Sequence, residues 1–120
     1  MCRGRLTLVF GCGGDRDRTK RPKMGKVAVK LADTIIITND NPRSEPPLSI
    51  IRDITRGLPA RRYRVVPDRR EAIRAALAGA RKGDCVLIAG KGHEGYQITG
   101  SSRTAFDDRK VAGACLRSTK

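Results

Sequence analysis

The residues that could do chemistry stand in three short segments, each placed directly after an apolar run. The segments are residues 11–17, 40–43 and 90–96, and the apolar runs before them are residues 6–10, 34–38 and 85–89. The segments combine arginine forks suited to carboxylates or phosphates, an asparagine amide that donates and accepts, and glycines that allow sharp turns. This combination predicts a binding site for a small charged ligand.

Residues 40–43, Asp-Asn-Pro-Arg, are the most informative of the three. Pro42 fixes its own φ and restricts Asn41, so the segment is stiff and aims its side chains in set directions. Arg43 follows with a planar guanidinium. The same residues also suit a polar turn that caps the next helix, because Asn-Pro pairs commonly mark loops.

Helical patterns separate the apolar runs. Pro22 suits the first turn of one helix, and Gly57 suits the position after the end of a second. Asp68 and Glu71 resemble a capping box that opens a third. The apolar positions of the three helices are Met24, Val27, Ala28 and Leu31; Ile50, Ile51 and Ile54; and Ala72, Ile73, Ala76, Leu77 and Ala80.

Strands and helices therefore alternate along the chain. A strand at residues 63–66 precedes the third helix, and a short strand at residues 96–98 follows the last apolar run. The final helical pattern runs through Val111, Ala112, Cys115 and Leu116. Such alternation predicts an α/β fold with a mostly parallel sheet and right-handed crossovers. Because ligands bind at the carboxyl ends of strands in these sheets, the three segments should share one edge.

In this order, the segments resemble the C-terminal domain of the Mur ligase family over about residues 6–116. The resemblance rests on residues 9–17, 20–22, 24–25, 40–43, 89–94 and 106–109. Several motifs in one order are more specific than any one alone. The resemblance implies a Rossmann-like three-layer domain that takes up residues 1–120 as a single unit, without the family's N-terminal and central ATP-binding domains.

The resemblance also implies a role in peptidoglycan synthesis. Such ligases use ATP and Mg²⁺ to activate the γ-carboxylate of D-glutamate on a UDP-MurNAc dipeptide precursor, and an incoming amine then forms the amide bond. The Asp-Asn-Pro-Arg form of residues 40–43 goes with members that add meso-diaminopimelate rather than lysine. No Gly-x-x-x-x-Gly-Lys-Ser/Thr sequence occurs, so the isolated chain is not expected to be active.

Individual residues acquire roles from the same resemblance. Arg16 and Arg43 match arginines that bind substrate carboxylates, and Asn41 matches a residue at the same end of the substrate. Glu94 and the carbonyl of Gly90 match acceptors for the distal ammonium group. The full set for meso-diaminopimelate is Arg16, Asp40, Asn41, Pro42, Arg43, Gly90 and Glu94, with Asp15, Lys91 and His93 as nucleotide or interdomain contacts and no catalytic or metal-ligating residue.

Residue types alone leave less specific explanations open. Gly13 and Gly14 suit a tight strand-to-helix turn, and Asp15 and Asp17 suit the positive end of the following helix dipole. His93 has no evident acid–base partner, which favours a hydrogen-bonding loop residue over a catalytic base. Lys91 is explained equally well as a solvated loop lysine.

Length and composition fit one small domain. A chain of 120 residues can form one modest core. No run is long enough to span a membrane and no signal peptide opens the chain, so we expect a cytoplasmic monomer. Its four scattered cysteines fit a reducing compartment. Residues 90–95 have Gly-x-Gly-x-x-Gly spacing, but a strand follows instead of a helix, which argues against a dinucleotide site.

The charge suggests a different partner. The formal net charge is +14, and basic domains often bind nucleic acid. The basic residues gather in two clusters: Arg16, Arg18, Lys20, Arg21 and Lys23; and Arg61, Arg62, Arg64, Arg69 and Arg70. Aromatic residues make up only 3%, too few for a base-stacking surface, so only weak non-specific binding is expected. A nucleic-acid-binding domain and a free-standing, catalytically inactive ligand-binding remnant remain the alternatives to a ligase domain.

Overall fold

The computed structural model describes residues 4–14, 17–89, 96–99 and 102–105. The elements are β1 (Leu6–Phe10), α1 (Lys20–Leu31), β2 (Thr34–Ile37), α2 (Pro47–Thr55), the 3₁₀ turn η1 (Ala60–Arg62), β3 (Arg64–Val65), α3 (Arg69–Gly79), β4 (Cys85–Ile88), β5 (Tyr96–Thr99) and β6 (Ser102–Ala105). None of the helices in these ranges is both long and apolar enough to cross a bilayer.

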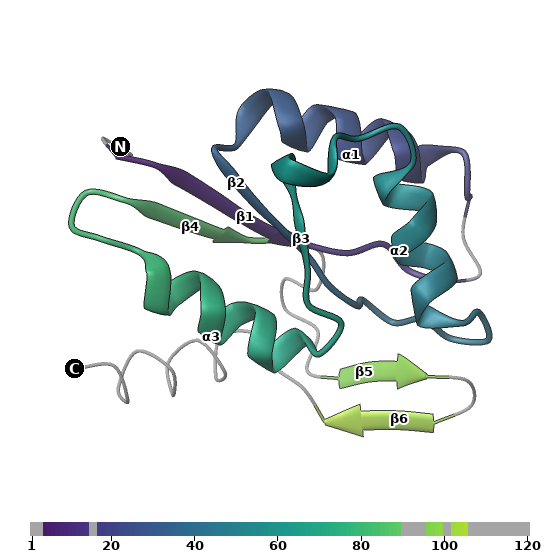
Figure 1. The fold of residues 1–120 in the computed structure, drawn as a ribbon. Helices are drawn as coiled ribbons and strands as arrows, with labels where there is room; N and C mark the ends of the chain where they lie inside the picture. Colours follow the sequence, from purple (N-terminus) through teal and green to yellow (C-terminus); the bar gives the residue numbers. More distant parts are fainter. Residues whose placement is uncertain (1–3, 15–16, 90–95, 100–101, 106–120) are drawn as a thin grey trace.

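The first four strands form one parallel sheet in the order β3-β2-β1-β4. Leu8 at the centre of β1 pairs with Ile35 of β2 on one side and with Leu87 of β4 on the other. Helices α1 and α2 lie on one face of the sheet and α3 on the other (Figure 1). The predicted three-layer α/β fold with a mostly parallel sheet is confirmed.

The core explains why the second strand is a continuous β-branched run. Ile35 and Ile37 pack with α1 and α2, whereas Ile36 between them packs with α3. At the end of β1, Phe10 likewise packs with α1 and α2, and Val9 packs with α3. A parallel strand covered on both faces has no polar side, and successive side chains point to opposite layers.

Two helix boundaries follow the sequence signals. Gly57, two residues after the last residue of α2, has a φ of 79°, a left-handed conformation that glycine adopts without steric cost. The Asp68 carboxylate accepts a hydrogen bond from the backbone N–H of Glu71 at 3.2 Å. The Glu71 carboxylate itself accepts from Arg74. Of the two bonds of the predicted capping box, the bond to the Asp68 carboxylate therefore caps the start of α3.

Other expectations need correction. Of the apolar positions predicted for the first helix, Ala28 is buried but Met24, Val27 and Leu31 are exposed, because no described element covers that side of α1. The strand expected at residues 63–66 shrinks to Arg64–Val65 at the edge of the sheet.

The expected strand near residues 96–98 is present as β5, and it pairs with an antiparallel β6 that the sequence did not predict. The expected helix through Val111, Ala112, Cys115 and Leu116 lies outside the described residues.

Candidate functional site

The loops after β1 and β2 lie directly against each other. The backbone N–H of Gly14 donates to the carbonyl of Asn41 at 2.8 Å. A Cβ atom built on Gly14 would lie 1.6 Å from the carbonyl oxygen of Pro42, and one on Gly11 would lie 2.3 Å from that of Thr38. Close approach of the two loop backbones, rather than the tight turn considered from the sequence, is what requires glycine at position 14.

The loop of residues 40–43 has an unusual backbone. Asn41 and Arg43 have φ values of 41° and 56°, and Pro42 between them is fully buried. Asparagine tolerates this left-handed region, but for arginine it costs on the order of 1–3 kcal/mol. Such strain persists only where the surroundings fix the backbone, and here the close contact with Gly14 supplies that constraint.

The guanidinium of Arg43 is anchored on one side. Its Nη1 donates to the carbonyls of Gly14 at 3.0 Å and Asn41 at 3.3 Å. Within the described ranges, its Nε and Nη2 donate to no acceptor, and the side chain is half-buried. The arrangement leaves an oriented pair of N–H donors, the geometry that a carboxylate accepts from arginine.

Among the other candidate residues, Asp40, Asn41 and Pro42 belong to the same described loop as Arg43. Asn41 is almost fully buried and Asp40 is half-buried. The chain after β4 starts beside β1, because the N–H of Ala89 donates to the carbonyl of Val9 at 2.9 Å. The structure thus brings the carboxyl ends of β1, β2 and β4, after which the three segments follow in the sequence, to one edge of the sheet. Asp15, Arg16, Gly90, Lys91, His93 and Glu94 fall outside the described residues.

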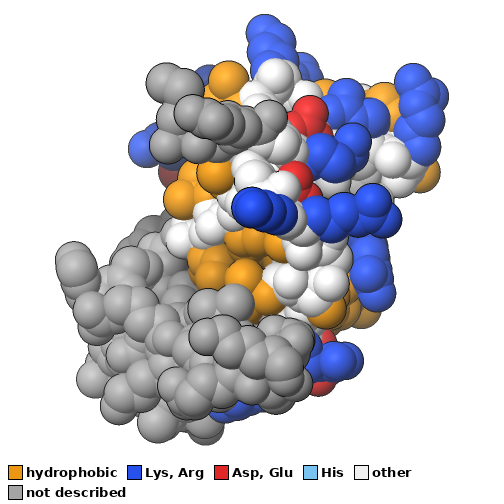
Figure 2. All heavy atoms as spheres, turned by 90° about the vertical axis from the view of Figure 1, so that its left-hand side faces the viewer, with side chains coloured by type: hydrophobic (Ala, Val, Ile, Leu, Met, Phe, Trp, Pro, Cys, Tyr) orange, Lys and Arg blue, Asp and Glu red, His pale blue; other side chains and the backbone are white. Residues whose placement is uncertain are grey.

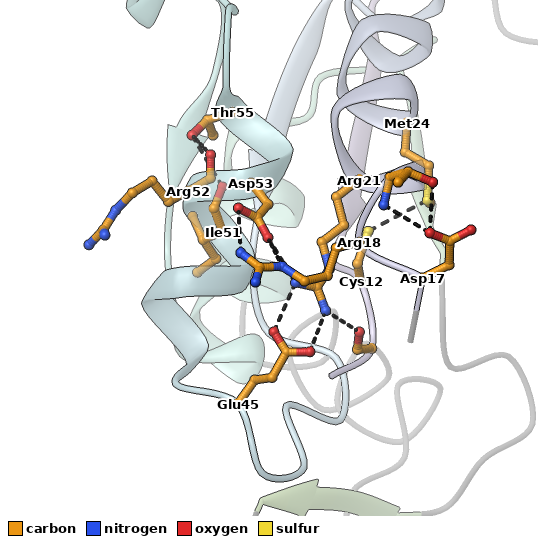
Figure 3. Close-up of polar contacts among 12 residues, drawn as sticks. Cys12, Asp17, Arg18, Arg21, Met24, Glu45, Ile51, Arg52, Asp53 and Thr55 are labelled. Carbon is orange, nitrogen blue, oxygen red and sulfur yellow. Dashed lines mark hydrogen bonds and ion pairs between the residues drawn. The ribbon is translucent and has the colours of Figure 1, made fainter. Parts of the chain in front are cut away.

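A buried arginine that the sequence analysis placed in a basic cluster organises this edge. The side chain of Arg21 is 1% exposed. Its guanidinium forms a two-bond pair with Glu45, at 2.8 and 2.9 Å, and donates to Asp53 at 2.9 Å and to the carbonyl of Gly13 at 3.0 Å (Figure 3). Arg21 therefore ties the loop after β1 to the loop after β2 and to α2.

The charged groups in this network shift one another's pKa values. The hydrogen bond from Arg18, followed by that from Arg21, lowers the pKa of Asp53. The pair with Glu45 raises the pKa of Arg21 further above its ordinary value. Both shifts favour the ionised forms of Asp53 and Arg21 at neutral pH. The Nε of Arg21 is buried without an acceptor in the part of the chain that the structure describes.

A second arginine from the predicted basic clusters is also buried. Arg69 donates to the carbonyls of Asn39 at 2.9 Å and Ala89 at 3.1 Å, which are the residues just beyond β2 and β4. Arg62 similarly donates to the carbonyls of Val29 and Ala32 at the end of α1. These arginines hold backbone in place, so the two clusters overstate the basic surface that a partner can reach. No local signal marks them, because their acceptors lie far away in the sequence.

The remaining polar groups near the loops have structural explanations. Asp17 accepts from the N–H and hydroxyl of Thr19 before α1, and these bonds lower the pKa of Asp17. Burial raises the pKa of Cys12 to about 11, and its thiol lies 3.5 Å from the sulfur of Met24. A protonated thiol is a poor nucleophile. Across the described ranges, no group of His, Cys, Asp and Glu side chains is arranged to hold a metal ion.

Comparison with known proteins gives a consistent result. Residues 1–92 match the family described as Mur ligase, glutamate ligase domain. The chain is 55% identical over 116 residues to the UDP-N-acetylmuramoyl-L-alanyl-D-glutamate–2,6-diaminopimelate ligase of Bacillus velezensis, which covers 97% of this chain and 24% of that protein. It is 58% identical over 114 residues to the ligase of the same name from Synechococcus elongatus, covering 94% and 23%.

A solved structure of a ligase with that name superposes with a TM-score of 0.93. It is 44% identical in sequence, and the match covers 98% of this chain and 24% of that one. The chain therefore spans less than a quarter of the length of these relatives.

Proposed function

The chain belongs to the Mur ligase family, and we propose that it is the amino-acid-binding domain of a peptidoglycan ligase that adds meso-diaminopimelate. The observation that carries this proposal is the anchored guanidinium of Arg43, which holds two N–H donors at the edge of the sheet where the three segments begin. The relatives named for diaminopimelate addition support the choice of substrate.

In this proposal the arginines bind the substrate's carboxylates. Arg43 holds the carboxylate at the end of diaminopimelate where lysine has none, and Arg16 holds a carboxylate elsewhere in the pocket. Because Nη1 of Arg43 is already fixed by two carbonyls, less side-chain entropy is lost on binding. Bound lysine would leave the guanidinium unpaired in a closed site. Because an unpaired buried charge is costly, such a site should reject lysine strongly.

The other candidates complete the pocket. Asn41, flanked by Asp40 and Pro42, fixes the same end of the substrate. The carbonyl of Gly90 and the Glu94 carboxylate accept hydrogen bonds from the distal ammonium group. The complete set also has Asp15, Lys91 and His93 facing nucleotide or another domain.

This chain does not form a complete site for ATP and Mg²⁺ by itself. The sequence has no phosphate-binding Gly-x-x-x-x-Gly-Lys-Ser/Thr loop, and the described residues offer no cluster of metal ligands. We therefore place both cofactors, and the UDP-MurNAc dipeptide precursor, on ligase polypeptide outside these 120 residues. The role of this chain is to bind and orient the incoming amino acid.

The test uses a chimeric ligase in which this chain replaces the matching part of the Bacillus velezensis enzyme. Replacing Arg43 with alanine removes a charge-assisted hydrogen-bond pair worth about 1.5–3 kcal/mol. We expect kcat/KM for diaminopimelate to fall roughly ten- to a hundredfold, with KM for ATP unchanged. Arg43→Lys should recover little of the lost kcat/KM, because an ammonium group lacks the planar pair of N–H donors of a guanidinium.

Arg52 provides the matched control. It is an exposed arginine of α2 whose side chain points away from the Arg21 network (Figure 3). Arg52→Ala should leave both kinetic constants unchanged. If the Arg43→Ala enzyme used diaminopimelate as well as its parent, the proposed pocket would be wrong.

Nucleic-acid binding stays the alternative because of the exposed charge. Figure 2 shows a face on which Lys and Arg side chains far outnumber Asp and Glu. With Arg21 and Arg69 buried, we expect only weak binding to DNA that is independent of sequence and fades steeply as salt rises. Tight, sequence-selective binding at physiological salt would favour the alternative.

A further inference from the structure

An apolar groove of about 440 Å³ lies on the α1 face of the sheet, between α1 and β4. Its floor includes Leu8 and Phe10 of β1 and Leu87 of β4, and its wall includes Val27 and Leu31 of α1. Val27 is 53% exposed and Leu87 is 54% exposed, although both belong to regular elements of the fold. A contiguous apolar surface of this kind marks an interaction site.

The groove exists because β4 is covered on one face only, within the described ranges. Val86 and Ile88 pack against α3, but no described helix covers Leu87, which points to the opposite face. On that face α1 and α2 pack side by side over β1 and β2, and the described helix layer stops at α1.

The handedness of parallel crossovers determines which chain segment can fill this place. The chain steps from β1 to β2 to β3 with its helices on one face, and it returns to β4 with α3 on the other. Right-handed crossovers require this division of the helices. A helix that leads into β1 from a parallel strand beside β4 moves in the same direction as α1 and α2. It must therefore lie on their face, directly over the groove.

Charge indicates what kind of helix fits. Lys20 and Lys23 line the end of the groove beside the first turn of α1. A helix leading into β1 would run parallel to α1, so its own first turn would lie beside these lysines. Acidic residues are favoured there both by the lysines and by the helix dipole. A second copy of this chain is a poor occupant, because its net charge of +14 would be repelled.

We propose that the groove is the seat of an amphipathic helix, acidic in its first turn, supplied by ligase polypeptide outside these 120 residues and leading into β1 from a strand that pairs with β4. The relatives have such polypeptide, since the chain matches only 24% of the Bacillus velezensis ligase. The α1 helix has 12 residues, and a helix of about that length, roughly 18 Å, would cover the groove. The inference rests on the proposed function only in that the occupant belongs to the ligase.

The test compares the same substitutions in the isolated chain and in the chimeric ligase. Val27→Glu and Leu87→Glu should each shift the melting temperature of the isolated chain by no more than about 2 °C, because both side chains face solvent there. In the chimera each substitution should lower the melting temperature of this domain by at least about 5 °C, because the new carboxylate is buried under the helix. Leu48→Glu is the matched control: Leu48 is 58% exposed on α2, outside the groove, and should be neutral in both proteins.

Lys20 and Lys23 provide a second test, in which the melting temperatures of the isolated chain and of the chimera should change in opposite directions. Replacing both Lys20 and Lys23 with glutamate places acidic residues in the first turn of α1, which should hold or raise the melting temperature of the isolated chain. In the chimera the same change should lower it, because the acidic turn of the docked helix loses its partners.

Three results would overturn the proposal. The groove is open in the ligase if Val27→Glu and Leu87→Glu are as neutral in the chimera as Leu48→Glu. It is filled from within the 120 residues if both variants destabilise the isolated chain as much as the chimera. It is a self-association surface if sedimentation shows an isolated dimer that Val27→Glu dissociates. None of these readouts involves diaminopimelate, so they stand apart from the test of Arg43.

Discussion

Arg21 and Glu45 form a two-bond ion pair, Nη1 to Oε2 at 2.9 Å and Nη2 to Oε1 at 2.8 Å, between the start of α1 and the loop after β2. The same guanidinium holds the carbonyl of Gly13, one residue before the glycine that contacts Arg43. One buried side chain thus links the residue before Gly14 to Glu45, which lies two residues after Arg43.

Arg21→Met should destabilise the domain strongly. Removing the buried cation takes from Glu45 its two-bond partner and leaves Asp53 with the exposed Arg18 alone, at a cost of about 3–5 kcal/mol. For a domain of this size the melting temperature should fall by about 10–20 °C in calorimetry. Arg18→Ala is the control: Arg18 also bonds Asp53, but its side chain is 62% exposed, so the drop should be much smaller. Equal effects of the two changes would show that burial of Arg21 contributes nothing special.

Gly14→Ala should separate the two loops. The new Cβ would overlap the carbonyl oxygen of Pro42, so the hydrogen bond from Gly14 to Asn41 must break or lengthen. We expect a lower urea midpoint and, in the chimeric ligase, a raised KM for diaminopimelate. Gly79→Ala is the matched control, because a Cβ there meets nothing within 4 Å. A Gly14→Ala protein with unchanged midpoint and KM would contradict the close-approach explanation.

Lowering the pH should destabilise the fold over a defined pH range. The bonds from Arg18 and Arg21 lower the pKa of Asp53, and the backbone N–H groups of Arg81 and Arg5 lower that of Asp84. A carboxyl group with a lowered folded-state pKa contributes stability above its unfolded pKa and loses it as pH falls through the folded value. The melting temperature should therefore be nearly flat from pH 7 to about 5 and fall below about pH 4.

Asp53→Asn tests which group is responsible. The variant should be less stable than the parent at pH 7, and the difference should shrink as the pH approaches about 2. Glu71→Gln serves as the control, because Glu71 and its partner Arg74 are both exposed. A gap between Asp53→Asn and its parent that stays constant down to low pH would rule out a contribution from this titration.

The isolated chain should not form the amide bond. Supplied with ATP, magnesium, UDP-MurNAc dipeptide and diaminopimelate, the purified protein should release neither phosphate nor tripeptide product, because it has no phosphate-binding loop. The chimeric ligase is the positive control. Turnover by the isolated chain would refute the assignment of ATP to polypeptide outside it.

The sequence by itself determined the architecture, because the signals involved are local. The β-branched run at residues 34–38, Gly57 after α2 and Asp68 before α3 each act through neighbours within a few residues. Alternating strands and helices then allow few topologies, so the three segments at one sheet edge could also be predicted. The residues proposed to contact the substrate came from motif order rather than from geometry.

Tertiary structure alone decided which charged and apolar residues are buried. Arg21 looks like part of a basic cluster in the sequence, yet its partners Glu45 and Asp53 come from later loops and helices. Val27 looks like a core residue of an amphipathic helix, yet the surface it faces is open. Gly14 is required by Pro42, 28 residues further along the chain. Burial depends on what packs opposite a side chain, and those partners are distant in the sequence, so no local pattern could reveal them.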